Sequence, residues 1–387
     1  MPRRRAQFSM STSALPATSD EIATHVANRI GLIELERPKA LNALSTGMIR
    51  AIHAALDQWR EDPEVLAVVV RSRHERAFCA GGDIRFMYEA AQTGDQEARD
   101  TFFSEEYRLN HAIFVYPKPY IALMNGIVMG GGVGISQGAH RTGGLRVVTP
   151  STKMAMPETR IGLFPDVGAS WFLARTPGAI GRYLAVTGAT IGAADALYAG
   201  LADAYIDDAA LPALVDRLSR EPFERGADVV ACVERETLAY QVAPRPEESA
   251  LAKARTLIDR HFALPDVARI LKSLEQERER GGDAAEWAEQ TIAVLRERSP
   301  LSMAVSLEVV TRAEGSMADV LRTDLDLTRS SFLRGDTVEG IRARIIDKDN
   351  APRWRFARIE DVNRADVEQM FDSPWPANEH PLGALRG

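Results

Sequence analysis

The sequence predicts an α/β core followed by a helical region. Short runs rich in valine and isoleucine alternate with helical patterns over the first half of the chain, and glycine-rich turns follow two of these runs. After about residue 208 the patterns are helical and are separated by short proline or glycine breaks. Because strands that alternate with helices favour an α/β fold, we divide the chain into a tail (1–22), an α/β core (23–208) and a C-terminal helical region (209–387).

Six runs in the core are expected to form strands. Residues 28–36, "NRIGLIELE", carry four isoleucine or leucine side chains in a strand-like pattern. Residues 66–72, "LAVVVRS", are rich in valine, which is typical of a strand buried on both faces. The stretch "KPYIALMNG" predicts a third strand. The remaining short strands are expected at "LRVVT", "KMAMP" and "LADAYID".

Two helices of the core are predicted from their capping residues and apolar faces. Ser45 is a suitable N-cap for a helix whose apolar face consists of Met48, Ile52, Leu56 and Trp59. Asp100 is the expected cap of a helix that continues to about Phe114. In this second helix Glu106 shares the apolar stripe of Phe102, Leu109 and Ile113, so we expect its carboxylate to face inward. A register shifted by one residue would leave Glu105 or Glu106 exposed.

Composition and charge argue against several classes of protein. Hydrophobic residues make up 45% and charged residues 26% of the 387 residues, as in globular proteins. The net charge of −7 argues against a nucleic-acid partner, and the lack of an apolar run of about 18 residues argues against a membrane helix. Cys79, Cys232 and seven histidines without metal-ligand spacing suggest neither a disulfide framework nor a metal site. We therefore expect a reducing compartment, either the bacterial cytoplasm or, in a eukaryote, the mitochondrial matrix.

The first twenty residues are basic at their start and then rich in Ser, Thr and Ala. Their arginine content resembles that of a mitochondrial transit segment. A disordered tail, or a translation start at Met10, accounts for the same residues equally well. The tail is therefore expected to be either a targeting segment or disordered.

Two familiar motifs occur in the glycine run at 130–138, and both are weak. "GISQG" matches the G-x-S-x-G pattern of a serine nucleophile, but that elbow needs a strand leading directly into the serine, and "MGGGV" is a poor strand. We expect Ser136 to lie inside a helix instead. The glycines also resemble a dinucleotide-binding loop, but the next strand ends in Thr149 and Pro150, without the acid that would bind the ribose.

The glycine turns are more informative as a pair. Gly81–Gly82 and Gly130–Gly131–Gly132 each follow a predicted strand and precede a predicted helix. The first N–H groups of a helix have no partner within it, and two such groups aimed at one point form an oxyanion hole. Glycine suits this role because it has no Cβ to block close approach. We therefore interpret the two turns as a candidate oxyanion hole.

The stretch "MPETRIGLFPDVG" places two carboxylates, Glu158 and Asp166, in an apolar segment stiffened by Pro157 and Pro165. Loops are usually polar and exposed, so acids among Met, Ile, Leu, Phe and Val mark a candidate site. Two carboxylates in one pocket repel each other and need a polar partner. A substrate hydroxyl that donates a hydrogen bond to Asp166 would relieve this cost.

Five stretches of the chain resemble the enoyl-CoA hydratase/isomerase (crotonase) superfamily in order and spacing. They are "ERPKALNALS", "AFCAGGDI", "KPYIALMNGIVMGGGVGIS", "MPETRIGLFPDVG" and "EGIRARIIDKDNAPRW". The resemblance covers about residues 24 to 370. Within the superfamily, "FFSEEYRLN", "MPETRIGLFPDVG" and "RGDTVEGIRARIIDKDNAPRW" are similar to the hydrolases that act on 3-hydroxyisobutyryl-CoA, a thioester of valine degradation.

The resemblance implies a crotonase-like spiral of ββα units with a C-terminal helical region that covers the active site. It implies that an acyl-CoA thioester binds with its carbonyl oxygen on the backbone amides of Gly82 and Gly131. Lys39, Ala40 and Ile84 would approach the CoA nucleotide. Because CoA is part of the substrate, no cofactor is expected. The acyl-CoA is the expected partner, and a homo-oligomer is compatible with the sequence, which leaves the oligomeric state open.

The resemblance also assigns roles to the acids. Hydratases of the superfamily use two glutamates, whose positions correspond here to Gly134, which has no acid, and to Glu158. The hydrolase pattern pairs Glu158 with Asp166 and adds Glu106 to the substrate pocket, and this sequence matches all three. Glu158 would activate water or attack the thioester carbonyl, and Asp166 would orient the substrate hydroxyl or the water.

We therefore expect a hydrolase that releases CoA from 3-hydroxyisobutyryl-CoA. Two alternatives stay open at this point. One is a hydratase or isomerase of the same fold that acts on another acyl-CoA, and the other is a non-catalytic structural subunit. The missing acid at Gly134 argues against the first alternative, and the intact set of Glu106, Glu158 and Asp166 argues against the second.

Overall fold

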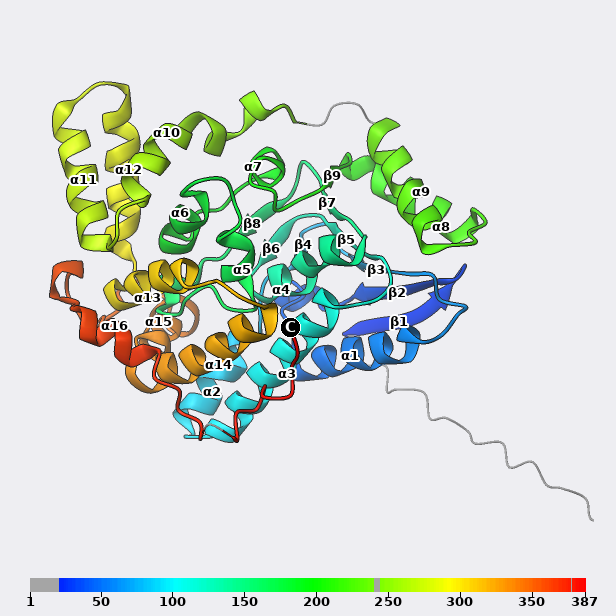
Figure 1. The fold of residues 1–387 in the computed structure, drawn as a ribbon, viewed down its shortest axis with the longest axis horizontal. Coiled ribbons are helices and arrows are strands. Elements are labelled where there is room, and N and C mark those ends of the chain that lie inside the picture. Colours follow the sequence, from blue (N-terminus) through cyan, green and yellow to red (C-terminus); the bar gives the residue numbers. More distant parts are fainter. Residues whose placement is uncertain (1–20, 240–243, 377) are drawn as a thin grey trace, which may run out of the picture.

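The computed structural model describes residues 21–239, 244–376 and 378–387. In this part of the chain the strands form one sheet of six strands and one of three, and helices surround both (Figure 1). Of the predicted tail at 1–22, all but Glu21 and Ile22 lies outside the described residues, so the expectation of a targeting or disordered segment also lies there.

The two sheets are built by strands that alternate between them. In spatial order the large sheet contains β1 (Ile22–Ala27), β2 (Ile30–Leu35), β3 (Ala67–Ser72), β5 (Tyr120–Met124), β7 (Arg146–Val148) and β9 (Ala204–Tyr205). The small sheet contains β4 (Ala77–Cys79), β6 (Ile127–Met129) and β8 (Lys153–Ala155). β1 pairs antiparallel with β2, and the other neighbours in both sheets are parallel. This alternation confirms the spiral of ββα units.

Helices follow the strand pairs and dominate the second half of the chain. In the first half they are α1 (Thr46–Arg60), α2 (Ile84–Gln92), α3 (Gln96–Phe114), α4 (Gly131–Gln137), α5 (Ala169–Leu173), α6 (Ile180–Thr187) and α7 (Ala193–Tyr198). After residue 208 they are α8 (Leu211–Arg220), α9 (Gly226–Ala239), α10 (Ala250–Phe262), α11 (Val267–Arg280), α12 (Asp283–Glu297), α13 (Pro300–Thr311), α14 (Met317–Arg334), α15 (Thr337–Ile341) and α16 (Arg364–Met370). Three short turns matter below: η1 (Pro38–Ala40), η3 (Glu158–Ile161) and η6 (Arg342–Ile346).

The predicted helix starts are partly right. Ser45 caps α1, and its Oγ accepts a hydrogen bond from the Met48 amide at 3.2 Å. The expected cap at Asp100 is wrong, because α3 begins at Gln96 and Asp95 accepts from the Ala98 amide at 2.9 Å. Both aspartates have the right chemistry for a cap, and the apolar periodicity is too weak before Phe102 to decide between them. Helix α2 is the helix expected after Gly81–Gly82, although its bounds were not predicted, and the strands β1, β4 and β6 were not predicted.

Apolar layers cover both faces of the large sheet. In β3, Val68 and Val70 belong to the main core cluster, whereas Ala67 and Val69 belong to a second cluster on the opposite face. Helices α8 and α9 contribute side chains to the second cluster. They lie at the opposite end of the molecule from α11 (Figure 1). The prediction that residues 66–72 form a strand buried on both faces is confirmed, since alternate side chains enter different layers.

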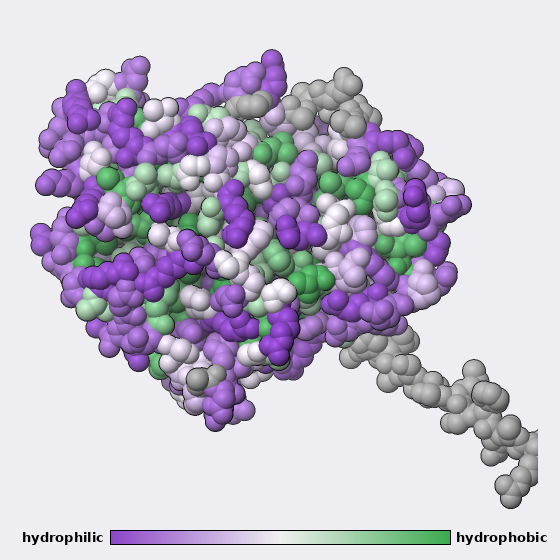
Figure 2. Space-filling model, viewed as in Figure 1, coloured by the Kyte–Doolittle hydropathy of each residue, from purple (hydrophilic) through white to green (hydrophobic). Residues whose placement is uncertain are grey.

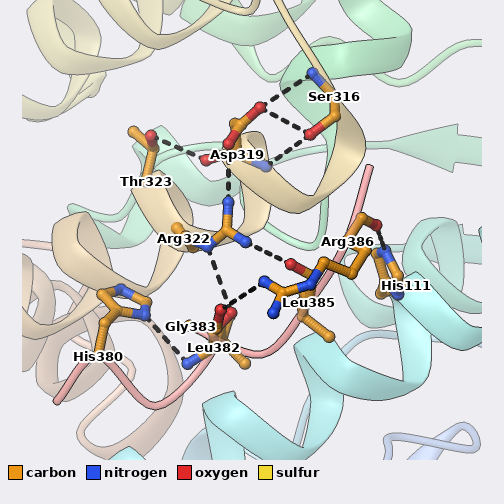
Figure 3. A network of polar contacts seen from close by, with 10 residues as sticks. All are labelled: His111, Ser316, Asp319, Arg322, Thr323, His380, Leu382, Gly383, Leu385 and Arg386. Atoms are coloured by element: carbon orange, nitrogen blue, oxygen red, sulfur yellow. Dashed lines mark hydrogen bonds and ion pairs between the residues drawn. The ribbon is translucent and has the colours of Figure 1, made fainter. Parts of the chain in front are cut away.

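The C-terminal tail ties α14 to α3 (Figure 3). Arg322 on α14 donates from Nε to the Leu382 carbonyl oxygen at 3.3 Å and pairs through Nη1 with Asp319 at 2.7 Å. On the α3 side, His111 Nε2 lies 2.7 Å from the Arg386 carbonyl oxygen. Because α3 also carries Glu106, these contacts hold a helix of the core against a helix of the C-terminal half.

On the face shown in Figure 2, hydrophilic residues cover most of the outer helices, and apolar residues lie between them in separate areas. Among the described residues, no helix combines the length and the apolar character that crossing a bilayer requires. Cys79 and Cys232 are both buried and carry free thiols.

Candidate active site

One cavity of about 710 Å³ collects most of the predicted site residues. Its walls come from the β4–α2 and β6–α4 turns, α3 and η3, together with the C-terminal elements α12, α14, α15 and η6. Six predicted residues line it: Gly82, Ile84, Glu106, Gly131, Glu158 and Asp166. The structure does not bring Lys39 and Ala40 to the cavity wall, because both lie on η1, where Lys39 is exposed.

The two glycine turns lie against each other at the buried end of the cavity. A Cβ on Gly81 would lie 3.8 Å from the Gly131 nitrogen. Gly81 and Gly130 have φ angles of +119° and +49°, which other residues rarely adopt. The Gly82 amide donates no backbone hydrogen bond within the described residues, and Gly131 is the first residue of α4, where an N–H has no intrahelical partner. The site therefore offers two unpaired backbone N–H groups.

Glu106 lies on the inner face of α3, as predicted, and is only 2% exposed. A Cβ on Gly131 would lie 2.5 Å from its Oε1, so a larger residue at that position would displace the carboxyl group. Oε1 has no hydrogen-bond partner in the described residues. Burial raises the pKa of Glu106 well above its usual range, and the negative charge of Asp166 raises it further. The folded protein therefore favours a neutral Glu106.

Glu158 begins η3 directly after Pro157. Its side chain is buried, and its Oε2 has no hydrogen-bond partner among the described residues. A Cβ on Gly130 would lie 3.2 Å from Oε1, which places the carboxyl group beside the second glycine turn. Burial raises the pKa of Glu158 well above its usual range, and the charges of Asp166 and Glu106 add to this effect. Such a poorly solvated carboxylate is a strong base.

Asp166 is the better hydrogen-bonded of the two acids in the proline-stiffened segment. The Tyr107 hydroxyl donates to its Oδ2 at 2.7 Å, and the same hydroxyl lies 2.7 Å from Thr328 Oγ1 on α14. Burial raises the pKa of Asp166 to about 6, although the hydrogen bond from Tyr107 opposes this shift. The next residue, Val167, has a φ of +53°, which is strained for a β-branched side chain.

Asp324 is a fourth acid near this site, and the sequence reasoning missed it. It lies on α14, is fully buried, and accepts a hydrogen bond from the Gly168 amide at 2.8 Å through Oδ2. Burial raises the pKa of Asp324 well above its usual range, and the charge of Asp166 contributes. One signal was available, since Asp324 and Thr328 are spaced i, i+4 on the buried side of an otherwise amphipathic helix.

Gly134 and Ser136 lie in α4 and take no catalytic position. A Cβ on Gly134 would meet Asn110 Nδ2 and Val167 Cβ, each at 2.8 Å, so neighbouring side chains already fill the space of an acid there. Ser136 is fully buried, and its Oγ donates to the Gly132 carbonyl oxygen at 2.8 Å. The prediction that Ser136 lies inside a helix is confirmed, which argues against a serine nucleophile.

The C-terminal helices cover the site, as the resemblance implied, but the individual residues that they contribute to its wall were not predicted. Trp287 and Val294 on α12, Phe332 on α14 and Ile341 on α15 line the cavity. Ile341 lies within the stretch "EGIRARIIDKDNAPRW" that carries the resemblance, whereas no motif marks the other three, which reach the cavity only when the helices pack. Among the described residues, no cluster of three or more His, Cys, Asp or Glu side chains has an arrangement that could hold a metal ion.

Comparisons with known proteins show which family and fold this chain resembles. The family described as enoyl-CoA hydratase/isomerase matches residues 30–371. The mitochondrial 3-hydroxyisobutyryl-CoA hydrolase of Gallus gallus is 38% identical over 345 residues, which covers 88% of this chain and 86% of that protein.

Two solved structures share the fold over nearly their whole length. A carnitinyl-CoA dehydratase from Mycobacterium thermoresistibile has a TM-score of 0.82 at 37% identity, covering 95% of this chain and 100% of that one. An enoyl-CoA hydratase from Rhodobacter sphaeroides has a TM-score of 0.81 at 37% identity, covering 92% of this chain and 98% of that one.

Proposed function

The chain belongs to the enoyl-CoA hydratase/isomerase family, and from this premise we propose that it hydrolyses 3-hydroxyisobutyryl-CoA to the free hydroxy acid and CoA. The observation that carries the proposal is one cavity in which two buried carboxylates, Glu158 and Asp166, lie beside two glycine turns with unpaired amides. The relative from Gallus gallus is named for this reaction.

The amides of Gly82 and Gly131 act on the thioester carbonyl. When a nucleophile adds to the carbonyl carbon, negative charge develops on the carbonyl oxygen, and preorganised N–H donors stabilise that charge. Glu106 lies next to these amides, and its raised pKa favours the neutral form of its carboxyl group. A neutral carboxyl group there avoids placing a second negative charge beside the developing oxyanion.

Glu158 supplies the base. It removes a proton from water while the water oxygen bonds to the carbonyl carbon, and the tetrahedral intermediate then breaks its C–S bond. The thiolate of CoA takes the proton back from Glu158, which restores the site. In the other route, the Glu158 carboxylate attacks the carbonyl and expels CoA as the thiolate, which forms an anhydride. Water then hydrolyses the anhydride to the hydroxy acid and the Glu158 carboxylate, and the proton that this water loses goes to the thiolate. The raised pKa of Glu158 makes its carboxylate both a stronger base and a stronger nucleophile, so it suits both routes.

Asp166 recognises the substrate hydroxyl. Its Oδ2 already accepts from Tyr107, and its carboxyl group lies on the wall of the cavity. A 3-hydroxyl group that donates to Asp166 gives this buried acid a second partner. This role explains why a second acid is kept close to Glu158 in spite of the repulsion between like charges.

Hydration of an enoyl-CoA is the second candidate function, because the two solved structures carry the names of a dehydratase and a hydratase. Adding water across a double bond needs groups that both remove and supply protons. At Gly134 the space for an acid is filled by Asn110 and Val167. This packing favours the hydrolase.

The deciding experiment measures CoA release from 3-hydroxyisobutyryl-CoA and hydration of crotonyl-CoA by the same preparation. We expect rapid release of CoA and little hydration, and the reverse result would contradict the proposal. A single turnover in H₂¹⁸O then separates the two routes, since only the anhydride route leaves ¹⁸O on the Glu158 carboxylate.

The remaining parts of the proposal concern context. The reaction needs no cofactor, because CoA is part of the substrate. We place the protein in the bacterial cytoplasm, with the mitochondrial matrix as the alternative, and fractionation of the source cells decides between them. The acyl-CoA is the proposed partner, and light scattering of the purified chain tests whether it forms a homo-oligomer.

A further inference from the structure

A second, small cavity lies between α3 and α14, which pack side by side (Figure 1). Among the described residues only these two helices line it, with Arg99 and Phe103 on α3 and Thr328, Phe332 and Leu333 on α14. Its volume of about 10 Å³ has room for about one water molecule. Leu333 is 54% exposed, so the cavity reaches the surface of the protein there. We call it the α3–α14 pocket.

This pocket lies directly behind the wall of the active site. Phe103 and Phe332 line both cavities, so their rings form a partition between them. Thr328, which also lines the pocket, is hydrogen-bonded to the Tyr107 hydroxyl, and that hydroxyl donates to Asp166. The inner end of the pocket is therefore two hydrogen bonds away from an acid of the active site.

Arg99 is a buried cation without a matching partner. It is only 8% exposed, and among the described residues its side chain forms no ion pair and no hydrogen bond, with its Nε fully buried. Its guanidinium lies 5.2 Å from the centre of the Phe332 ring. Buried charges in proteins are normally paired, and a guanidinium has five N–H groups to donate. An unpaired Arg99 therefore marks the pocket as a site for an anion.

The acids near Arg99 have other partners. Asp100 pairs with Arg329 at 3.7 Å, and Asp95 is exposed and accepts from the Ala98 amide at the start of α3. Burial lowers the pKa of Arg99, and the charge of Arg329 adds to this effect, whereas Asp100 and Asp95 oppose it. A bound anion would offset the burial of this guanidinium.

We infer that Arg99 binds the carboxylate of the hydroxy acid product and that the acid leaves the active site through the α3–α14 pocket. This inference rests on the proposed function. Hydrolysis converts an uncharged acyl thioester into an acid whose negative charge appears next to the carboxylates of Glu158 and Asp166. Like charges repel, so the acid is driven away from them. A guanidinium group binds a carboxylate through two parallel hydrogen bonds, which suits Arg99 to receive it.

In the structure the partition between the two cavities is closed. A carboxylate group needs more room than one water molecule, so the acid reaches Arg99 only when the Phe332 ring turns aside. This ring is only partly buried, and the next residue, Leu333, is exposed, so the ring has solvent on one side to turn into. The contact between Phe332 and Arg99 therefore covers the cation until the product replaces the ring.

The order of product release tests this route. An acid that leaves through the α3–α14 pocket can depart while CoA still fills the main cavity. Inhibition against 3-hydroxyisobutyryl-CoA should then be competitive for CoA and noncompetitive for 3-hydroxyisobutyrate. Competitive inhibition by the acid would overturn the inference, because the acid and the substrate would then use the same opening.

Arg99→Gln tests the binding group. It should weaken inhibition by 3-hydroxyisobutyrate about 10-fold, the scale of a lost charge-assisted hydrogen bond, and leave KM for the thioester unchanged, because the substrate carries no carboxylate. Arg50→Gln is the matched control, since Arg50 is 61% exposed and pairs with Glu105 of α3 outside both cavities. Unchanged inhibition in Arg99→Gln, or an equal loss in the control, would overturn the inference.

Leu333 provides a second test that leaves the interior intact. Leu333→Glu places a negative charge at the exposed rim of the pocket and should weaken inhibition by the acid a few-fold, whereas Leu333→Lys should strengthen it. Val115→Glu is the control, because Val115 is 42% exposed and lines neither cavity. Changes of the same sign in both Leu333 variants, or no change in either, would count against the route.

A wild-type protein that does not hydrolyse the thioester would refute the proposed function alone. Calorimetric titration of the wild type and of Arg99→Gln with 3-hydroxyisobutyrate would then still test the carboxylate site. Weaker binding to the variant would support the site, and equal affinities would overturn it.

Discussion

The buried end of the cavity and the wall made by the C-terminal helices are built in different ways. At the buried end, short segments between residues 80 and 168 place backbone amides and carboxyl groups, and their positions follow from glycine turns and prolines. On the helical wall, long side chains on α12, α14 and η6 reach the cavity because the helices pack together. The first end depends on local backbone geometry, and the second depends on tertiary contacts.

This difference predicts where substitutions act. Changes at the buried end should affect the chemical step, because these groups lie closest to the proposed reacting atoms. Changes on the helical wall should affect substrate affinity or the position of the buried groups. The following predictions test that division, beginning with the largest expected effect.

Glu158→Gln should lower kcat by roughly 10²–10⁴, the range of general-base catalysis. Glutamine keeps the shape of the side chain and removes its basic oxygen. Ser136→Ala is the matched control, because Ser136 is buried and bonded within α4 and should not contribute. Steady-state rates on 3-hydroxyisobutyryl-CoA measure both. A large loss in the serine variant with none in the glutamine variant would refute the assignment of the base.

Gly131→Val should lower kcat by about 10²–10³, the cost of losing one oxyanion donor. Its Cβ would lie 2.5 Å from Glu106 Oε1, 3.1 Å from Leu44 Cδ1 and 3.3 Å from the Gly81 carbonyl carbon, so it would crowd both the Glu106 carboxyl group and the facing glycine turn. Gly192→Ala is the control, since a Cβ there meets no atom within 4 Å. Circular dichroism shows whether both variants fold. A folded Gly131→Val protein with normal turnover would show that the carbonyl binds elsewhere.

The same division explains what the sequence could predict. The large-sheet strands at 30–35 and 67–72, the cap at Ser45 and the inward position of Glu106 depend on local pattern, and the structure confirms them. β4 and β6 have three residues each, which is too short to give a pattern. The start of α3 was misplaced because two aspartates were equally suitable caps.

The residues of the helical wall could not be predicted from the sequence for a different reason. Arg298 occurs among many arginines, and only the packing of its segment after α12 brings it to the cavity. Arg344 lies within the stretch "EGIRARIIDKDNAPRW" that carries the resemblance, but nothing in that stretch shows that its side chain lines the cavity. Asp324 is distinguished from the other acids of α14 by its complete burial, which depends on the contact between α14 and α3. Long-range contacts of this kind leave little trace in a single sequence.

Asp166→Ala should reduce kcat/KM for 3-hydroxyisobutyryl-CoA roughly 10- to 100-fold while changing that for isobutyryl-CoA much less. A buried acceptor left without its partner costs about 1–3 kcal/mol, so the wild type should discriminate against the substrate that lacks the hydroxyl. Measuring both substrates on both proteins gives the coupling directly. Equal losses on the two substrates would mean that Asp166 acts on the water or on Glu158.

Asp324 links the two regions, because a residue of the helical wall holds the backbone of the buried end. Its Oδ2 accepts a hydrogen bond from the backbone amide of Gly168. Gly168 directly follows the strained Val167, which in turn follows Asp166. Asp324→Ala leaves this buried amide unpaired, at a cost of about 1–3 kcal/mol in stability. We expect Asp324→Ala to lower kcat a few-fold, because the segment that positions Asp166 becomes less rigid. Asp324→Asn should lose much less, since its side-chain oxygen still accepts the hydrogen bond from the Gly168 amide.

The dependence of stability on pH separates this positioning role from a charge effect. The pKa of Asp324 is raised in the folded protein, so the folded state holds its proton more tightly, and wild-type stability should fall as pH rises from about 4, the usual pKa of an unfolded aspartate. Asp324→Asn removes the titrating group. Its free energy of unfolding, measured by denaturant titration at pH 4 to 8, should therefore fall less than that of the wild type. If the stability of the two proteins depended on pH in the same way, Asp324 would be ionised without cost. The idea that a protonated Asp324 accepts the hydrogen bond from Gly168 would then be abandoned.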